Sequence, residues 1–229
     1  MKKIIYSLSI ITVIIITSCK KIENVAPTGT ETPTSPSSYT VTLQPGTEGN
    51  DAVINALNPT TNYGNVPFLA IEAWTQSGAG RIQRSLIDFD YSSIPSEATI
   101  TSAKLTLYAD TTYNYSAGSV PPGHSQLSGS NAWNLSRVTS AWNEQTVTWA
   151  TMPTIDAATT LSLPASTSAS QSYTIDVTTF VKAEIANPSA YYGFLLNLVT
   201  ETPYRAVYFY SSDDSHTAEH PTMVIEYTK

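Results

Sequence analysis

Two patterns in this chain contain residue types that could carry out hydrolysis. The first, His216-Thr-Ala-Glu219-His220, has the H-x-x-E-H spacing in which a helix presents two histidines and a glutamate to catalytic zinc. Zinc hydrolysis also needs a third protein ligand, and downstream only Glu226 could supply it. Pro221 follows the pattern directly, so no helix is predicted to hold it. We therefore expect a loop with two solvated histidines rather than a zinc protease.

The second pattern is the pair Asp88 and Asp90, which alternate along a predicted strand and place their carboxyl groups about 7 Å apart on one outward face. Retaining glycosidases need two carboxyls at a similar separation, but almost any two alternate acids on a strand meet that condition. The other role for such oxygens is to bind Ca²⁺. A structural calcium site is a further hypothesis, built from Asp88, Asp90 and Asp213, with Asp51 and Asp176 as additional candidates. No cofactor is required, and we expect a protein that is not an enzyme.

The stretch Arg84–Asp110 predicts the elements that position these acids. Ile87, Phe89 and Tyr91 alternate with acidic residues in its first half, and apolar residues alternate with polar ones in its second half. A period of two with one apolar face is typical of a half-buried strand. Pro95 lies in the serine-rich middle, so we predict a hairpin of two strands around a corner.

Similar segments recur along the chain, and turn residues such as Gly, Pro and Asn separate them. Many short strands separated by turn residues predict a β-sandwich or a closed barrel. The predicted strands are Tyr39–Leu43, Asp51–Leu57, Phe68–Trp74, Ile82–Tyr91, Ile100–Ala109, Asn134–Thr139, Tyr173–Asp176, Phe194–Val199, Ala206–Tyr210 and Met223–Tyr227.

One segment, at about residues 177–187, has the period of a helix instead. Asp176 or Thr178 could cap its start, and Pro188 would end it. A single helical face carries the apolar residues Val177, Phe180, Val181 and Ile185. We predict one short helix across an end of the sandwich.

The N-terminal residues predict an export signal with a lipid attachment site. Lys2 and Lys3 precede the apolar run Ile4–Ile16, which is too short to span a bilayer and suits a signal-peptide core. The run ends near Cys19, the only cysteine in the chain, in a context that resembles the bacterial lipobox. An ordinary signal peptide with a chance cysteine is the alternative.

These features predict three regions. Residues 1–18 are the lipoprotein signal peptide, residues 19–38 the lipidated Cys19 and a disordered tether rich in Pro, Thr and Ser, and residues 39–229 the folded domain. Such a chain would be a lipoprotein of the Bacteroidota type. Its anchor would hold it to the outer membrane, on the cell surface or the periplasmic face.

The charge of the domain excludes one class of partner. Residues 39–229 contain 7 Lys and Arg against 16 Asp and Glu, a net charge of −9. Nucleic-acid binding depends on neutralising phosphates, so we expect no nucleic-acid partner.

The domain resembles the DNRLRE domain family, which is related to disaggregatase-type and alginate-associated carbohydrate-binding modules. The matching pieces occur in the order of the family and cover nearly all of the domain. They are Asp51-Ala-Val-Ile, Asn62-Tyr63-Gly64, Arg84 through Asp90, Ile100–Tyr108, Trp142-Asn-Glu144 through Trp149, Asp176-Val-Thr178, Gly193-Phe194, and Ser211-Ser212 through Tyr227. Where the name motif might stand, this chain has Phe68-Leu-Ala-Ile-Glu72.

The resemblance implies an all-β fold, a jelly-roll-like antiparallel β-sandwich without catalytic activity. It also implies a polysaccharide partner, since some relatives bind acidic polysaccharides such as alginate. A polyuronate would need a local basic groove on this acidic domain. The residues that could form it are Arg81, Arg84, Lys104, Arg137, Lys182 and Arg205.

Sugar binding generally needs a flat aromatic ring and planar hydrogen-bonding groups. Trp142 and Trp149 lie in a matching run and are expected to pack in the core or at its rim. Long loops on a rigid sandwich often carry function, so the insertion at residues 111–131 is also a candidate region. The candidate carbohydrate-binding residues are Trp74, Arg81, Arg84, Tyr113, Tyr115, His124 and Trp133.

Two hypotheses for function follow. The first is a lipid-anchored, non-catalytic protein of the cell envelope that binds polysaccharide. The alternative is a structural or adhesion domain that contacts another envelope protein and binds no sugar. Burial of Trp74 and Trp133 would favour the alternative, because a buried ring cannot stack on a ligand.

Overall fold

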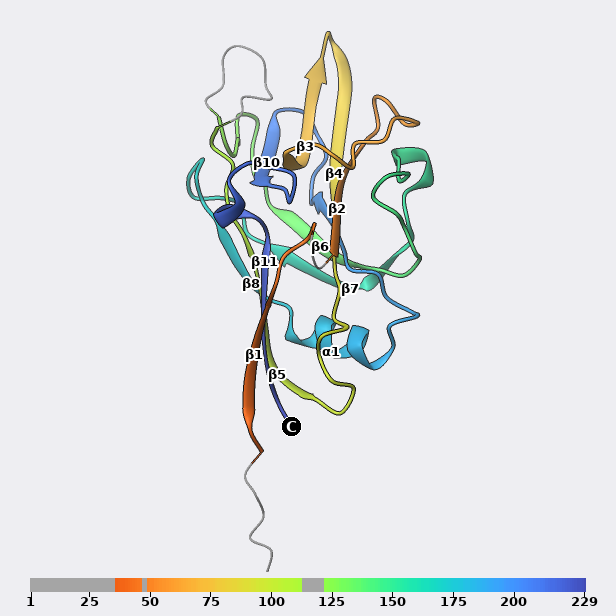
Figure 1. The fold of residues 1–229 in the computed structure, drawn as a ribbon. Coiled ribbons are helices and arrows are strands. Elements are labelled where there is room, and N and C mark those ends of the chain that lie inside the picture. The colour runs from red at the N-terminus through yellow and green to blue at the C-terminus, as the bar shows by residue number, and fades with distance from the viewer. Residues whose placement is uncertain (1–35, 47–48, 113–121) are drawn as a thin grey trace, which may run out of the picture. The chain divides into compact units, whose positions relative to one another are not determined.

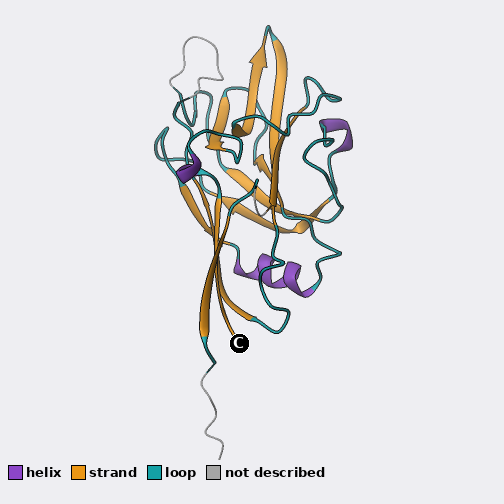
Figure 2. Ribbon diagram, viewed as in Figure 1, coloured by secondary structure: helices purple, strands orange, loops and turns teal. Residues whose placement is uncertain are grey.

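Two antiparallel β-sheets and one α-helix make up the domain (Figures 1 and 2). The computed structural model describes residues 36–46, 49–112 and 122–229. Its elements are β1 Ser38–Leu43, β2 Gly49–Asn55, β3 Phe68–Gln76, β4 Ala79–Phe89, β5 Thr99–Leu107, β6 Trp133–Val138, β7 Ile155–Leu163, β8 Tyr173–Asp176, α1 Thr178–Ala186, β9 Phe194–Leu198, β10 Arg205–Tyr210 and β11 Thr222–Thr228.

The smaller sheet has four strands in the order β1-β11-β5-β8. The larger has seven: β10-β3-β4-β9-β6-β7, with β2 paired to β4 outside this path. All the pairings between these strands are antiparallel. The predicted all-β sandwich with one short helix is confirmed.

One hydrophobic cluster joins the two sheets. Leu105 on β5 and Ile225 on β11 come from the smaller sheet, while Ile71 on β3 and Leu196 on β9 come from the larger. Each of these four side chains is fully buried. The period of two explains the arrangement, because alternate side chains of each strand point to the same face.

The predicted hairpin at Arg84–Asp110 is wrong, although both of its strands are present. β4 belongs to the seven-stranded sheet and β5 to the four-stranded sheet, so the corner between them carries the chain from one sheet to the other. β4 cannot pair with β5 over this length because β2 lies along one of its edges and β3 and β9 along the other.

The helix α1 runs from Thr178 to Ala186, as the apolar pattern predicted. Its N-cap residue is Val177, which has no side chain that could cap the helix. The carboxylate of Asp176 instead accepts hydrogen bonds from the backbone N–H and the hydroxyl of Thr178. Val181 is buried in the main core and packs the helix against it. None of the helices formed by the described residues is long and apolar enough to cross a membrane.

Candidate functional site

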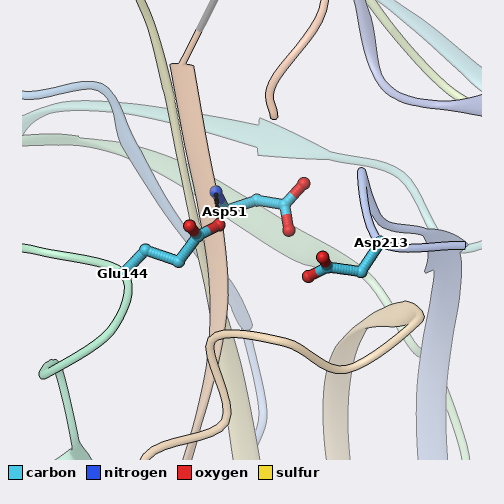
Figure 3. Close-up of side chains that lie close together, drawn as sticks. All are labelled: Asp51, Glu144 and Asp213. Carbon is cyan, nitrogen blue, oxygen red and sulfur yellow. Dashed lines mark hydrogen bonds between the residues drawn. The ribbon is translucent and has the colours of Figure 1, made fainter. Parts of the chain in front are cut away.

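Three acidic side chains from distant parts of the chain meet at one place, which we call the acid cluster (Figure 3). Asp51 lies on β2, Glu144 in the loop after β6, and Asp213 in the turn after β10. Each offers a carboxylate oxygen, and these three oxygens lie within 4.8 Å of one another. Asp51 is buried, Glu144 is half-buried and Asp213 is exposed, so the cluster opens to solvent on one side.

The loop that carries Glu144 is held in place by a side chain from another matching piece of sequence. The side-chain amide of Asn62 donates to the backbone carbonyls of Glu144, at 2.7 Å, and Val147, at 2.8 Å. One Glu144 carboxylate oxygen accepts a bond from the backbone N–H of Asp51, at 3.1 Å. The N–H of Ser212 donates to the Asp51 carboxylate at 2.8 Å. Four of the pieces that carry the family resemblance therefore converge on the acid cluster.

The electrostatics of the acid cluster favour a cation. The pKa of Asp51 is raised to about 7, mainly by burial and also by the neighbouring charges of Asp213 and Glu144, although two hydrogen bonds from Ser212 lower it. Carboxylate oxygens are the ligands that Ca²⁺ prefers, and it takes 6–8 of them. The acid cluster provides the carboxylate part of such a set, so its residues fit the ion chemically.

Only part of the predicted calcium set comes together here. Asp51 and Asp213 are joined by Glu144, which sequence analysis did not propose as a ligand although it lies in a matching motif. Asp176 lies elsewhere, in an ion pair of 2.6 Å with Lys104. Asp88 and Asp90 also lie outside this group.

Asp88 has an acidic partner that the sequence did not reveal. Its carboxyl group hydrogen-bonds with that of Glu184, a buried residue on α1. Burial is the largest cause that raises the pKa of Asp88 to about 6 and that of Glu184 to about 8. Two carboxyls in direct hydrogen-bonding contact share a proton, and they are too close for the pair of a retaining glycosidase, which needs about 5 Å.

This pair predicts a pH dependence of stability. Because both pKa values are raised on folding, the pair contributes most at low pH, and the contribution is lost as the pH rises from about 4 through the folded values. Between pH 5 and 8.5, we expect the free energy of unfolding of the wild type to fall by roughly 3 kcal/mol more than that of Glu184→Gln. Chemical denaturation at a series of pH values measures this difference. Parallel curves for the two proteins would contradict the assignment.

A second group, which we call the arginine surface, consists of Trp74, Arg81, Arg84, Trp149 and Glu201. Trp74 on β3 and Arg81 on β4 are direct partners across the two strands. Both line a pocket of about 160 Å³ together with Glu201. Glu201 also binds Arg84 through two hydrogen bonds of 2.8 and 2.9 Å, and the Arg84 guanidinium lies 4.8 Å from the ring centre of Trp149.

Three of the predicted sugar-binding residues, Trp74, Arg81 and Arg84, are thus brought together. Both arginines already have carboxylate partners, since Arg81 pairs with the buried Glu72 at 2.6 Å. Trp74 is only 6% exposed, and Tyr204 packs edge-on against its ring. The arginine surface therefore offers planar polar groups at the exterior and only the margin of an aromatic ring.

Two other candidate sugar-binding residues, Trp133 and His124, are buried and cannot contact a ligand. Trp133 is fully buried among the rings of Tyr173 and Phe209. His124 is 6% exposed, with Nε2 2.7 Å from the carbonyl oxygen of Gln171 and Nδ1 3.0 Å from the backbone nitrogen of Tyr208. Both side chains therefore have structural roles.

Tyr113 and Tyr115 lie outside the described residues, as do Cys19 and the predicted signal peptide. In the H-x-x-E-H pattern, residues Thr217–Glu219 form one short turn of 3₁₀-helix, which is too short to present both histidines on one face. His216 is exposed and lies 2.7 Å from the carboxylate of Asp214, whereas His220 is buried, contrary to the expectation that both are solvated.

Comparison with known proteins identifies the family of this domain. A search of curated proteins gives no match. The family model described as carbohydrate-binding module family 96 matches residues 42–227, which is almost the whole of the described domain. The match includes the acid cluster, the arginine surface and both sheets. With its two-sheet architecture and this match over most of its length, the chain belongs to carbohydrate-binding module family 96.

Proposed function

We propose that this protein is a non-catalytic, lipid-anchored protein of the cell envelope that binds polysaccharide at the arginine surface. Membership of a carbohydrate-binding family supports the ligand class. The observation that carries the location is the shared pocket of Trp74, Arg81 and Glu201, which adjoins Arg84. The lipobox-like context of Cys19 supports attachment to the outer membrane, on the cell surface or the periplasmic face.

The arginine surface has the groups that a polysaccharide needs. Guanidinium and carboxylate groups present planar forks of donors and acceptors, which match pairs of adjacent sugar hydroxyls. The ion pair of Arg84 and Glu201 is fixed by two hydrogen bonds and by the ring of Trp149 below it. Little side-chain entropy would therefore be lost when a sugar binds there.

Affinity electrophoresis of the full-length chain in gels that contain neutral or acidic polysaccharides tests this proposal. We expect at least one polysaccharide to retard the wild type, and Arg84→Ala to reduce that retardation. Both side chains of the ion pair are only 21% exposed, so circular dichroism must first establish that this variant is folded. A folded protein that no polysaccharide retards would contradict the proposal.

Acidic polysaccharides of the alginate type are the ligand class that the resemblance implies. A uronate carboxylate could bind Arg84 only by displacing Glu201, because that carboxylate already occupies the guanidinium fork. We therefore expect Glu201→Gln to strengthen retardation by alginate about three- to tenfold. Glu226→Gln, at an exposed position on β11, makes the same change in net charge and is the matched control. Equal effects of the two substitutions would exclude exchange at Arg84.

Calcium is part of this proposal as a structural ion held by the acid cluster. An ion there would remove the cost of burying a charged Asp51 beside two other carboxylates. We expect added Ca²⁺ to raise the thermal unfolding midpoint of the wild type, and Asp213→Asn to reduce the increase by at least half. Asp156→Asn, at an acid on β7 outside the acid cluster, is the control. An equal increase in all three proteins would contradict binding at this position.

The alternative function, an adhesion domain that binds another envelope protein, has one observation in its favour. Trp74 and Trp133, the two tryptophans proposed for sugar stacking, are 6% and 0% exposed. A cross-linking pull-down from envelope fractions that recovers one stable partner, together with no retardation by polysaccharides, would establish this second function.

A further inference from the structure

A larger pocket, which we call the helix pocket, is lined by residues from the end of β4, from the chain that follows it and from α1 and the segment after α1. Figure 1 shows where these elements lie in the fold. The volume of the pocket is about 510 Å³, enough for a sugar ring. Asp88 and Glu184 line it, and the exposed Asp90 lies among the other lining residues. It is separate from both the acid cluster and the arginine surface, with which it shares no residue.

The ionisable side chains of Asp, Glu, Lys, Arg or His type that line the helix pocket are all acidic. Three carboxyl groups line it, and none of the described lining residues is Lys, Arg or His. Asp88 and Glu184 share a proton at neutral pH, so the three groups together carry two negative charges, and a cation that binds between this pair takes the place of the proton. The cation that acts on Glu184 is Arg137 of β6. That guanidinium is covered, since it lies 5.1 Å from the ring centre of Phe180 and 4.2 Å from that of Tyr191, and the residue is 7% exposed. An anionic ligand is therefore disfavoured, and a cationic one is attracted.

A second observation, independent of the acids, points to a missing ligand. The hydroxyl group of Tyr91, another lining residue, is buried and has no hydrogen-bond partner among the described residues. Burial is the largest cause that raises the pKa of Tyr91, and the nearby charges of Glu184 and Asp88 also raise it. A buried hydroxyl without a partner destabilises the folded protein, and a polar ligand at this point would remove that cost.

The rim of the helix pocket suits a ring that is polar at its edge and apolar on its faces. Tyr191 and Tyr192 line it and are partly exposed, and exposed Ser92 supplies a hydroxyl. Aromatic rings contact the C–H face of a sugar and also attract a nearby cation. We propose that the helix pocket binds an amino-sugar residue of a polysaccharide, with the protonated amine on the carboxyls of Asp88 and Glu184. This inference rests on the polysaccharide-binding function proposed above and names one substrate class for it.

Other ligands fit these contacts less well. A uronate or a sulfated sugar would bring a negative charge to three carboxyls. A neutral hexose offers hydroxyls only and leaves the charge of the carboxyls uncompensated. An N-acetylated sugar has lost the cationic amine. A lysine side chain carries the same cation, but it has no ring for Tyr191 and Tyr192 and no hydroxyls for Ser92.

The test measures binding of glucosamine, N-acetylglucosamine and glucose to the full-length chain at neutral pH by ligand-observed NMR. Glucosamine should bind about tenfold or more tightly than the other two, the effect of one charge-assisted contact. Glu184→Gln should remove most of this preference. Asp90→Asn should weaken it, and because Asp90 is exposed this variant does not depend on a change in the core. Glu226→Gln, at an exposed site on another sheet, should leave the preference unchanged.

The outcomes separate this inference from the proposed function. Equal binding of glucosamine and glucose, or a preference that survives both Glu184→Gln and Asp90→Asn, overturns the amino-sugar assignment. If Nα-acetyl-lysine amide binds as tightly as glucosamine, the ligand need not be a sugar, and the result overturns the amino-sugar assignment in favour of a peptide ligand. Retardation by polysaccharides without amino sugars, measured on the same variants, reports on the arginine surface and should survive Glu184→Gln.

Discussion

Replacing Trp133 by alanine is expected to lower the free energy of unfolding by about 4 kcal/mol. The side chain is fully buried at the start of β6 and is among the largest that are. Its ring packs edge-on against Tyr173, with ring centres 5.3 Å apart, and lies 5.7 Å from Phe209. Alanine would remove these contacts and leave a cavity between strands that are held by hydrogen bonds on both sides.

Urea denaturation monitored by circular dichroism measures this loss. Trp133→Phe is the graded control, because it keeps a ring in contact with Tyr173 and should cost only about 1–2 kcal/mol. If Trp133 were instead a ligand-stacking residue, alanine would leave stability nearly unchanged and abolish binding. That result would contradict the buried position of the ring.

The strands could be predicted from the sequence because each has a face in the core. Segments such as β5 alternate strictly, with buried Ala103, Leu105 and Leu107 separated by polar residues. β7, Ile155–Leu163, escaped prediction for the opposite reason. It is an edge strand that pairs with β6 alone, and its side chains, mostly Ala, Thr and Ser, are half-buried or exposed. Only Leu161 and Leu163, near its end, pack against the main core, so its apolar residues are too few for a clear period of two.

Strand pairing could not be predicted in the same way. The turn around Pro95 predicts that the chain changes direction, but only the occupied edges of β4 decide that β5 must enter the other sheet. Contacts between side chains far apart in the sequence follow from this pairing. The meeting of Asp88 with Glu184 is one of them, and no local pattern connects the two residues.

The burial of the four tryptophans could be predicted from the sequence only in part. Trp142 and Trp149 were expected to pack in the core or at its rim, and both are partly buried against a small apolar cluster. Trp133 and Trp74 stand beside polar loops in the sequence, which suggested exposure. Loops fold back over strand ends, however, so a position at the end of a strand does not determine burial.

A second large effect is expected from Gly64→Ala, which should lower the free energy of unfolding by more than about 3 kcal/mol. A Cβ atom added at Gly64 would lie 2.1 Å from the carbonyl oxygen of Glu144 and 2.8 Å from its carbonyl carbon. The same carbonyl accepts the 2.7 Å hydrogen bond from Asn62, so it cannot retreat without breaking that bond. The glycine of the matching Asn62-Tyr63-Gly64 piece is thus explained by the close approach of two backbones.

Gly80→Ala is the matched control for this prediction. Gly80 also has no positive φ, and a Cβ atom added there would meet nothing within 4 Å, so alanine should change stability by less than about 0.5 kcal/mol. Denaturation of the two variants side by side separates the close approach from the general cost of alanine in place of glycine. Because the Glu144 loop supplies one carboxylate of the acid cluster, the proposed calcium site predicts that Gly64→Ala also reduces the increase in unfolding midpoint with Ca²⁺. Equal stability of the two variants would mean that this loop is not packed against Gly64, and would remove the support for the position of Glu144.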